Sequence, residues 1–327
     1  MEGSLLGLAL GDALGFVVEA APPETASAYV DDWLLAGRAG ERGAPHFPFG
    51  QYSDDTQLAR ALLLGVCDAG GWDPAAFARR VAELFREGRD VGAGPGTRAA
   101  AQRLIDGQGW EEAGTPEPYA GNGSAMRVAP LGVLFAADPA LLRSAAVSQS
   151  RITHQDPRCA GASVAVAGAA ALAMRSGPLD RPTFLGELAE LVAPASDEVA
   201  ALVRGLETWA HLAPPAAAAH LRASGLDPGH TDPWQGISAF VLPSLAWSLY
   251  AFLAAPDDYW ATVGIAIAVG GDTDSMAAMA GGIAGARVGI EGLPQDVLAR
   301  LNDRGTWGAA ELGALARDCA RLVPGRT

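Results

Sequence analysis

Two short stretches of the sequence each place a pair of acids and a hydroxyl at the start of an apolar helix pattern. "QYSDDTQLARALL" at 51–63 has a serine and two aspartates directly before the helix. "VGGDTDSMAAMAGGIAGARVG" at 269–289 has two aspartates and a serine before a segment of Ala, Gly and Met. Carboxylates that converge repel one another unless cations hold them. Acids and hydroxyls in this pattern therefore suggest a site for hard divalent cations, which prefer oxygen ligands.

A simpler interpretation is that these acids cap their helices, because the first helical turn has unpaired N–H groups. Capping explains one acid for each helix, but it does not explain two with a hydroxyl beside them. Softer ligands are missing from both stretches, which favours Mg²⁺ or Mn²⁺ over zinc. The two stretches lie more than 200 residues apart, so their meeting is a prediction that the fold must test. The candidate metal ligands are Ser53, Asp54, Asp55, Asp272, Asp274 and Ser275.

The composition excludes several classes of function. The chain has 327 residues and a net charge of −14, which disfavours nucleic acid as a partner because phosphate backbones require basic patches. All 23 basic residues are Arg, so a P-loop lysine, a Schiff-base lysine and a lysine general base are excluded. An anionic ligand would need a local cation to reverse the negative field.

Other features favour a cytoplasmic protein that does not enter a membrane. The three cysteines are widely separated, which fits reduced thiols better than a disulfide framework or a zinc site. The N-terminus lacks a basic segment and contains Asp12, which we interpret as structural, so no signal peptide is expected. The uncharged window 237–255 contains Pro243 and has acidic flanks, and we expect a buried core helix there.

Apolar residues recur at helical spacing along most of the chain, and strand signals are scarce. We expect one domain over 1–327 with an all-α fold of about a dozen helices. Small residues repeat every four positions in 274–288, which predicts a buried helix that another helix approaches closely. Residues 213–235 are expected to form an irregular surface excursion. The predicted helices cover 4–20, 55–70, 73–88, 97–107, 124–137, 139–152, 157–177, 181–194, 196–213, 237–254, 256–269, 274–288 and a last segment near 308–321.

Five motifs in order resemble the ADP-ribosylglycohydrolase family over roughly residues 1–290. They are "GSLLGLALGDALGFVVE", "GQYSDDTQLA", "GNGSAMRVAPLG", "THQDPR" and "GGDTDSMAAMAGGIAGA". The resemblance implies a compact orthogonal multi-helix bundle with a binuclear Mg²⁺ or Mn²⁺ cleft. It also implies hydrolysis of the glycosidic bond between ADP-ribose and a protein side chain. The six candidate metal ligands match the family's ligand positions, although the family often has Thr where this chain has Ser53 and Ser275.

The resemblance also assigns roles to residues that local patterns would explain differently. Glu19 alone looks like a solvated acid at a helix end, "AGNGSAMR" at 120–127 like a plain turn, and His154 like a packing histidine before the Asp156 cap. The catalytic candidates are Asp90, Glu19 and Asp55. The substrate-binding candidates are Gly92, Gly121, Asn122, Gly123, Ser124, His154 and Tyr119, the last of which could stack on adenine or simply pack.

The implied enzyme is a metal-dependent ADP-ribosylglycohydrolase acting on an ADP-ribosylated protein, with N-linked arginine as the first expectation. Hydrolysis of an O-linked side chain (Ser, Asp or Glu) or of a free ADP-ribosyl compound would share every motif. A non-catalytic binding relative is a further alternative, but such relatives normally lose metal ligands, and all six are present here.

Overall fold

The computed structural model describes residues 1–226 and 234–322. In this part of the chain the regular structure is helical, and β-structure is limited to isolated bridges. The expected all-α fold is therefore confirmed. The α-helices are α1 (Glu2–Gly15), α2 (Pro23–Tyr29), α3 (Asp54–Ala69), α4 (Pro74–Arg86), α5 (Pro95–Ile105), α6 (Trp110–Ala113), α7 (Ala129–Leu134), α8 (Pro139–Arg151), α9 (Pro157–Ala173), α10 (Arg181–Val192), α11 (Asp197–Gly205), α12 (Pro214–Leu221), α13 (Val241–Ala254), α14 (Tyr259–Ala268), α15 (Thr273–Val288), α16 (Gln295–Leu298) and α17 (Ala309–Leu322).

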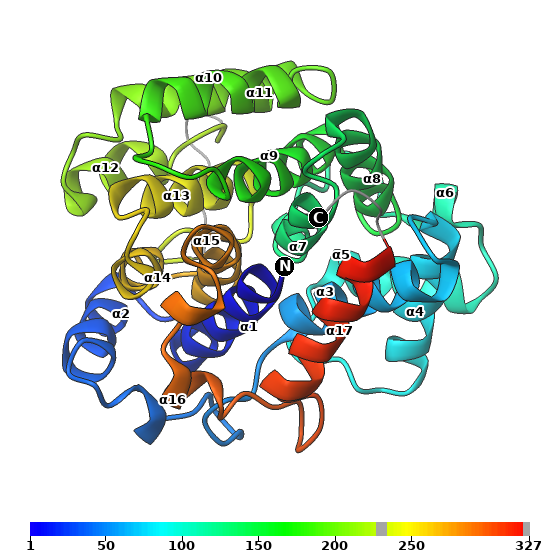
Figure 1. Ribbon diagram of the computed structural model, residues 1–327, viewed down its shortest axis with the longest axis horizontal. Helices are drawn as coiled ribbons and strands as arrows, with labels where there is room; N and C mark the ends of the chain where they lie inside the picture. Colours follow the sequence, from blue (N-terminus) through cyan, green and yellow to red (C-terminus); the bar gives the residue numbers. More distant parts are fainter. Residues whose placement is uncertain (227–233, 323–327) are drawn as a thin grey trace.

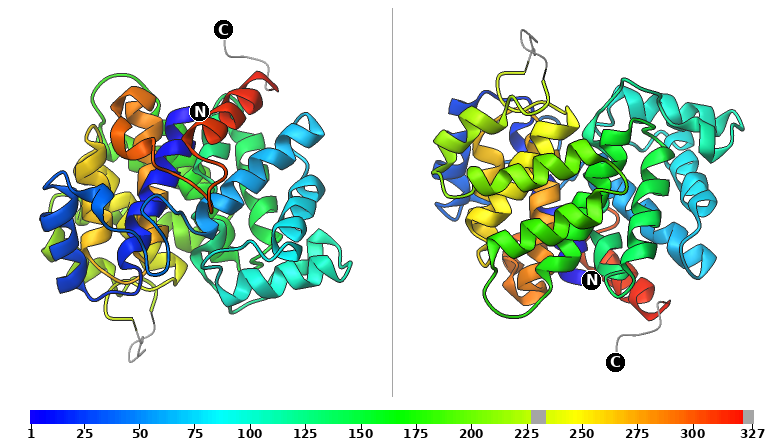
Figure 2. Two further views of the ribbon diagram at one scale, coloured as in Figure 1. Left: turned by 90° about the horizontal axis from the view of Figure 1, so that it is seen from below. Right: turned by 90° about the horizontal axis from the view of Figure 1, so that it is seen from above.

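Helices α1 and α15 pack side by side at the centre of the fold, and the other helices surround them in several directions (Figures 1 and 2). Helix α1 presents a glycine to α15 at every fourth position: Gly3, Gly7, Gly11 and Gly15. Gly3 lies against Gly285 and Gly15 against Thr273, so the two helices are antiparallel. A Cβ atom on these glycines would collide with α15 backbone, which explains why the small-residue pattern is needed. The packing brings the C-terminal end of α1 to the N-terminal end of α15.

Helix α3 packs against α1, and α17 covers the side where they meet. Its start is fixed to α1 by Asp12, whose carboxylate accepts hydrogen bonds from Ser53 N (2.9 Å), Thr56 N (3.0 Å) and Thr56 Oγ1 (2.6 Å). Asp12 is fully buried. These bonds fit the structural role expected for this acid, and they place the start of α3 beside the end of α1, where α15 also begins.

Most predicted helices lie within a few residues of the observed ones, and the differences have local causes. The helix expected over 124–137 begins only at Ala129, because residues 122–124 form a 3₁₀ turn and Pro130 occupies a first-turn position. Four short helices (α2, α6, α12 and α16) were not predicted, because segments of four to eight residues carry too little periodicity.

The segments 213–235 and 237–255 were expected to form an irregular surface excursion and a buried helix, respectively. The segment 213–235 is more regular than expected, since α12 packs Ala217 and Leu221 into the core; residues 227–233 lie outside the described part. The window 237–255 forms the buried helix α13, as expected. Of the helices that the structure describes, none is both long enough and apolar enough to cross a membrane.

Candidate active site

The two acidic helix starts open into one pocket of about 290 Å³. The predicted meeting of α3 and α15 is therefore present in the fold. A larger hollow of about 510 Å³ exists elsewhere, but its wall is mainly apolar and has a single acid, Glu24. The active-site pocket is lined by Glu19, Asp54, Asp55, Gly92, Ala93, Gly94, Pro95, Thr97, Tyr119, Gly121, Asn122, Gly123, Met126, His154, Trp234, Ala239, Asp272, Asp274 and Ser275.

The acids at the two helix starts do not serve as side-chain caps. In α3 the cap is Ser53, whose Oγ accepts a hydrogen bond from Asp55 N at 3.3 Å. Asp272 occupies the N-cap position of α15 but makes no capping hydrogen bond through its side chain. Asp54 and Asp55 each leave a buried Oδ2 atom without a hydrogen-bond partner. Capping therefore does not account for these carboxylates.

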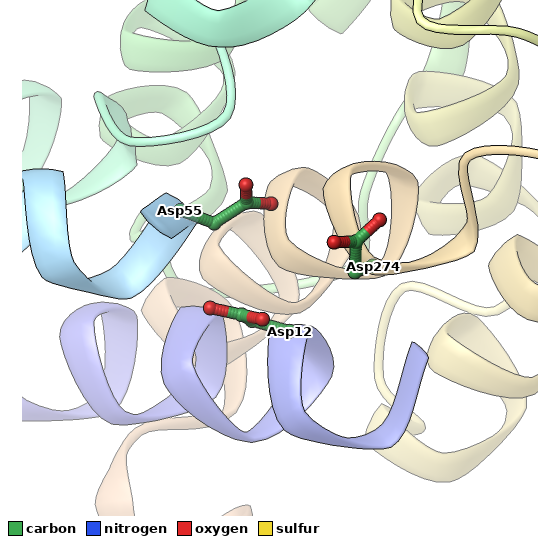
Figure 3. A group of neighbouring side chains, drawn as sticks. All are labelled: Asp12, Asp55 and Asp274. Atoms are coloured by element: carbon green, nitrogen blue, oxygen red, sulfur yellow. The ribbon is translucent and has the colours of Figure 1, made fainter. Parts of the chain in front are cut away.

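Three helices bring the carboxylates of Asp12, Asp55 and Asp274 close together (Figure 3). Oxygen atoms of Asp12, Asp55 and Asp274 lie within 4.8 Å of one another, as do oxygen atoms of Glu19, Asp272 and Asp274. Each group offers enough oxygen ligands at a suitable separation to hold a metal ion. Asp12, which belongs to the first group, was not among the predicted metal ligands.

The crowded carboxylates perturb one another strongly. Burial and then the charge of Asp274 raise the pKa of Asp12 from 3.8 to about 7. The charge of Asp274, and then burial, raise the pKa of Glu19 from 4.5 to about 10. Burial and Asp274 also raise the pKa values of Asp54 and Asp55 well above 3.8. Only protons or cations can relieve this repulsion, and the partnerless carboxylate oxygens fit divalent cations.

Ser53 and Ser275 flank the carboxylates in different ways. Ser275 lines the pocket, and its Oγ lies 3.5 Å from Asp55 Oδ1. Ser53 is fully buried beneath the pocket wall and is engaged in the α3 cap.

Another part of the pocket wall is formed by the glycine turn at 121–124. Asn122 N donates to Ala239 O (2.9 Å), and Asn122 Nδ2 donates to Asp272 Oδ2 (2.5 Å), which ties this turn to the acidic wall. Gly121, Asn122 and Gly123 line the pocket as predicted. Ser124 does not, because its hydroxyl points behind the turn toward Cys159 O and the Ser150 hydroxyl.

His154 and Tyr119 stand beside the turn, with ring centroids 5.7 Å apart. Both line the pocket, and so does Gly92, whose φ of +83° favours glycine. Burial, and next the charge of Arg127, lower the pKa of His154 to about 3, so the ring is neutral.

Asp90 lies beside the pocket but is not one of the residues that line it. Its Oδ2 is 2.6 Å from Arg98 Nη1, which holds the carboxylate in an ion pair. The following residue anchors the loop, because Val91 O accepts from Asp54 N at 2.7 Å. Asp90 therefore lies close to the pocket for which it was a catalytic candidate, but its carboxylate is paired with Arg98.

Sequence reasoning missed Thr97, Met126 and Ala239 in the pocket wall and the buried Arg127 behind the glycine turn. The apolar residues carried no separate signal. Arg127 did carry one, because a single arginine inside the apolar segment "SAMRVAPLG" requires a dedicated set of acceptors.

Comparisons with known proteins agree with this geometry. A family model described as ADP-ribosylglycohydrolase matches residues 1–327. The chain is 28% identical over 306 residues to ADP-ribosyl-(dinitrogen reductase) glycohydrolase of Rhodospirillum rubrum, covering 92% of this chain and 89% of the relative. It is 27% identical over 307 residues to ADP-ribosylarginine hydrolase Tri1 of Pseudomonas putida, covering 90% and 72%.

A solved structure, titled ADP-ribosylglycohydrolase-related protein complex, superposes with a TM-score of 0.69 at 28% identity, covering 98% of this chain and 97% of that one. Both named relatives hydrolyse ADP-ribosyl bonds according to their names. The family model spans the whole chain, and the fold and the acidic pocket agree with it. The chain therefore belongs to the ADP-ribosylglycohydrolase family and is an ADP-ribosyl hydrolase of the glycosidase class.

Proposed function

We propose that this enzyme hydrolyses the N-glycosidic bond between ADP-ribose and an arginine side chain, with the help of two divalent cations. The observation that carries the proposal is the pocket itself. One part of its wall gathers five carboxylates, and another part is a glycine turn with a neutral histidine. A ribose with its hydroxyls at the acidic wall and a diphosphate at the glycine turn would match these two surfaces.

The cations would be Mg²⁺ or Mn²⁺, held by Ser53, Asp54, Asp55, Asp272, Asp274 and Ser275. When bound, such ions supply positive charge that offsets the carboxylates and binds the vicinal hydroxyls of a ribose. Asp12 would support the cluster, because its three hydrogen bonds fix the start of α3. Asn122 would orient Asp272 through the bond to Oδ2.

Departure of a guanidine from the anomeric carbon requires a proton on the leaving group or opening of the sugar ring. Glu19 is the preferred donor, since it lines the pocket and, in the metal-free protein, the charge of Asp274 and burial raise its pKa. Asp90 is less suited, because Arg98 engages its carboxylate. Asp55 would accept or relay a proton at the cluster while it orients the attacking water.

Charge favours arginine as the linked residue. With Glu19 protonated, the four lining aspartates and Asp12 carry five negative charges against the four positive charges of two divalent cations, so the acidic wall would attract a cationic guanidinium. The relative named ADP-ribosylarginine hydrolase supports the same choice. The alternative is an O-linked side chain or a free ADP-ribosyl compound, which would place a linkage without a positive charge at that wall.

The test is release of ADP-ribose from arginine-, serine- and aspartate-linked substrates with Mg²⁺, Mn²⁺ or EDTA. We expect the arginine-linked substrate to be cleaved fastest and EDTA to abolish the reaction. Asp54→Ala and Asp272→Ala should each reduce the rate at least ~1000-fold. Asp68→Ala is the matched control, because Asp68 lies at the far end of α3 in an exposed pair with Arg80.

Full activity in Asp54→Ala, or undiminished turnover in EDTA, would refute the two-helix cation site. Faster cleavage of the serine- or aspartate-linked substrate would instead reassign the linkage to the O-linked alternative and leave the site intact. Binding of ADP-ribose without cleavage of any of the three substrates would favour a binding relative.

A further inference from the structure

Arg127 is fully buried behind the glycine turn, and every acceptor around its guanidinium is neutral. Nε donates to Gln149 Oε1 (2.8 Å), and Nη1 donates to Gly123 O (3.1 Å). Nη2 donates to Gln149 O and to Thr153 Oγ1, both at 2.9 Å. Burial lowers the pKa of Arg127 to about 9, so the group remains charged at neutral pH. A buried cation without a carboxylate against it is costly, and it adds positive charge to its surroundings.

The same guanidinium determines which nitrogen of His154 carries the proton. Thr153 Oγ1 accepts a hydrogen bond from Arg127 Nη2, and among the described residues its one other partner is His154 Nδ1, 2.9 Å away, so its buried hydroxyl hydrogen has an acceptor only when Nδ1 carries no proton. Nδ1 is then an acceptor, and a neutral ring must carry its proton on Nε2. Nε2 faces the turn, because a Cβ atom built on Gly121 would stand 3.4 Å from it.

We propose that Arg127 is a positioning residue that makes the glycine-turn end of the pocket an anion subsite. It fixes the turn through Gly123 O, and it holds His154 as an Nε2–H donor through Thr153. Its charge offsets the field of the carboxylates on the acidic wall. The identity of the anion, the diphosphate of an ADP-ribosyl group, rests on the proposed function. The positioning of His154 by Arg127 and Thr153 is independent of the proposed function.

The test uses Arg127→Met, Arg127→Lys and Thr153→Val in the full chain, with Thr262→Val as a matched control. Thr262 is also a buried threonine with one hydrogen bond, to Ala255 O at 2.8 Å, on the distant helix α14. The affinity for ADP-ribose is measured by calorimetry with saturating Mg²⁺. The tautomer of His154 is read from its ring ¹⁵N chemical shifts, assigned with His154→Gln.

We expect Arg127→Met to raise the Kd for ADP-ribose at least ~10-fold. Arg127→Lys should retain part of the affinity, because lysine keeps the positive charge but lacks the planar set of guanidinium N–H donors. Arg127→Met and Thr153→Val should both abolish the exclusive Nε2–H signature. Thr262→Val should change neither readout.

A folded Arg127→Met protein with wild-type affinity and wild-type His154 shifts would overturn the proposal. Should Arg127→Met not fold, Thr153→Val provides the test. An unchanged His154 tautomer in Thr153→Val would overturn the proposal that Arg127 positions His154 through Thr153. Failure of the wild-type protein to bind ADP-ribose would count against the proposed function, while the tautomer measurement would still test the positioning role.

A second, independent observation concerns two cysteines that are 252 residues apart in the sequence. Cys67 on α3 and Cys319 on α17 have Sγ atoms 3.0 Å apart. Cys319 is buried and Cys67 is partly exposed. The separation of these two cysteines along the sequence gave no sign of their proximity, which arises because α17 packs against α3.

We infer that Cys67 and Cys319 form a modification site that closes to an intramolecular disulfide when a low-molecular-weight disulfide is the oxidant. The thiolate of Cys67 attacks the reagent and releases one thiol. Burial raises the pKa of the Cys319 thiol, so this thiol releases its proton as its sulfur attacks Cys67 Sγ in the mixed disulfide and displaces the second thiol. The protein loses two electrons and two protons, and the reagent is reduced to two thiols. An S–S bond of about 2.05 Å needs the two atoms to approach by only about 1 Å.

The test is equilibration with excess glutathione disulfide, followed by denaturation and thiol counting. We expect the count to fall from three to one, with a mass loss of about 2 Da and a reversible rise in Tm of roughly 4–8 °C. Cys159→Ser should still close the bond, whereas Cys67→Ser and Cys319→Ser should not. Three remaining thiols, or a mixed disulfide that persists on Cys67, would overturn the inference.

Discussion

The metal-free protein should lose stability as pH rises from 6 to 8. Glu19 has a folded-state pKa of about 10, and Asp12 one of about 7, both above their ordinary values. In this window the folded protein holds protons at these groups that the unfolded chain has already released. Stability from a raised pKa is complete below the unfolded value and is lost as pH rises through the folded value.

The magnitude follows from linkage at about 1.36 kcal/mol for each pH unit and proton. Between pH 6 and 8, Glu19 contributes a loss of about 3 kcal/mol and Asp12 a loss of about 1 kcal/mol. His154 opposes them by about 1 kcal/mol, because its pKa of about 3 makes the unfolded chain bind more protons near pH 6. The net loss from these groups is about 3 kcal/mol, which for a chain of 327 residues corresponds to a fall in Tm of roughly 4–5 °C.

The assay is thermal and urea unfolding at pH 6, 7 and 8 in EDTA, repeated with saturating Mg²⁺ or Mn²⁺. With a cation the loss should shrink or reverse sign, because the ion binds deprotonated carboxylates and competes with protons. Stability in EDTA that is flat or rises over this window would refute the reasoning. It would mean that the carboxylates do not repel one another in the folded protein.

Two further predictions concern the packing that holds the site. Gly11→Ala should destabilise the protein by about 3 kcal/mol or more, since the new Cβ atom collides with the backbone of α15. Gly186→Ala should be neutral or slightly stabilising, because the space around Gly186 is open. The free energies of unfolding of the two variants are compared by urea unfolding. Asp303→Asn should lower the free energy of unfolding by about 3–5 kcal/mol, because it leaves the buried Arg60, 3.0 Å away, without its charge partner. Glu41→Gln, in an exposed ion pair with Arg38, should lower it by under about 1 kcal/mol. Similar losses for Asp303→Asn and Glu41→Gln would show that the buried pair is not needed.

Local features of the sequence determined the helices and the acid pairs. Helical periodicity and caps depend on residues three or four apart, so most helices could be placed within a few positions of their observed ends. Asp54, Asp55, Asp272 and Asp274 were identifiable because two acids and a hydroxyl exceed what a cap requires. The small-residue face of α15 predicted the close approach of another helix, and the sequence of α1 carries matching glycines at the same four-residue spacing.

Only the tertiary structure decided which side chains share the pocket and which support it. Asp12 joins the carboxylate cluster because α1 and α15 are antiparallel, and no spacing along the chain encodes that. Ser124 lies behind the glycine turn because the turn's direction is set by hydrogen bonds to the segment before α13. The contacts between α1 and α15, and those between the turn and the segment before α13, join residues more than a hundred positions apart, and their geometry depends on how whole helices pack.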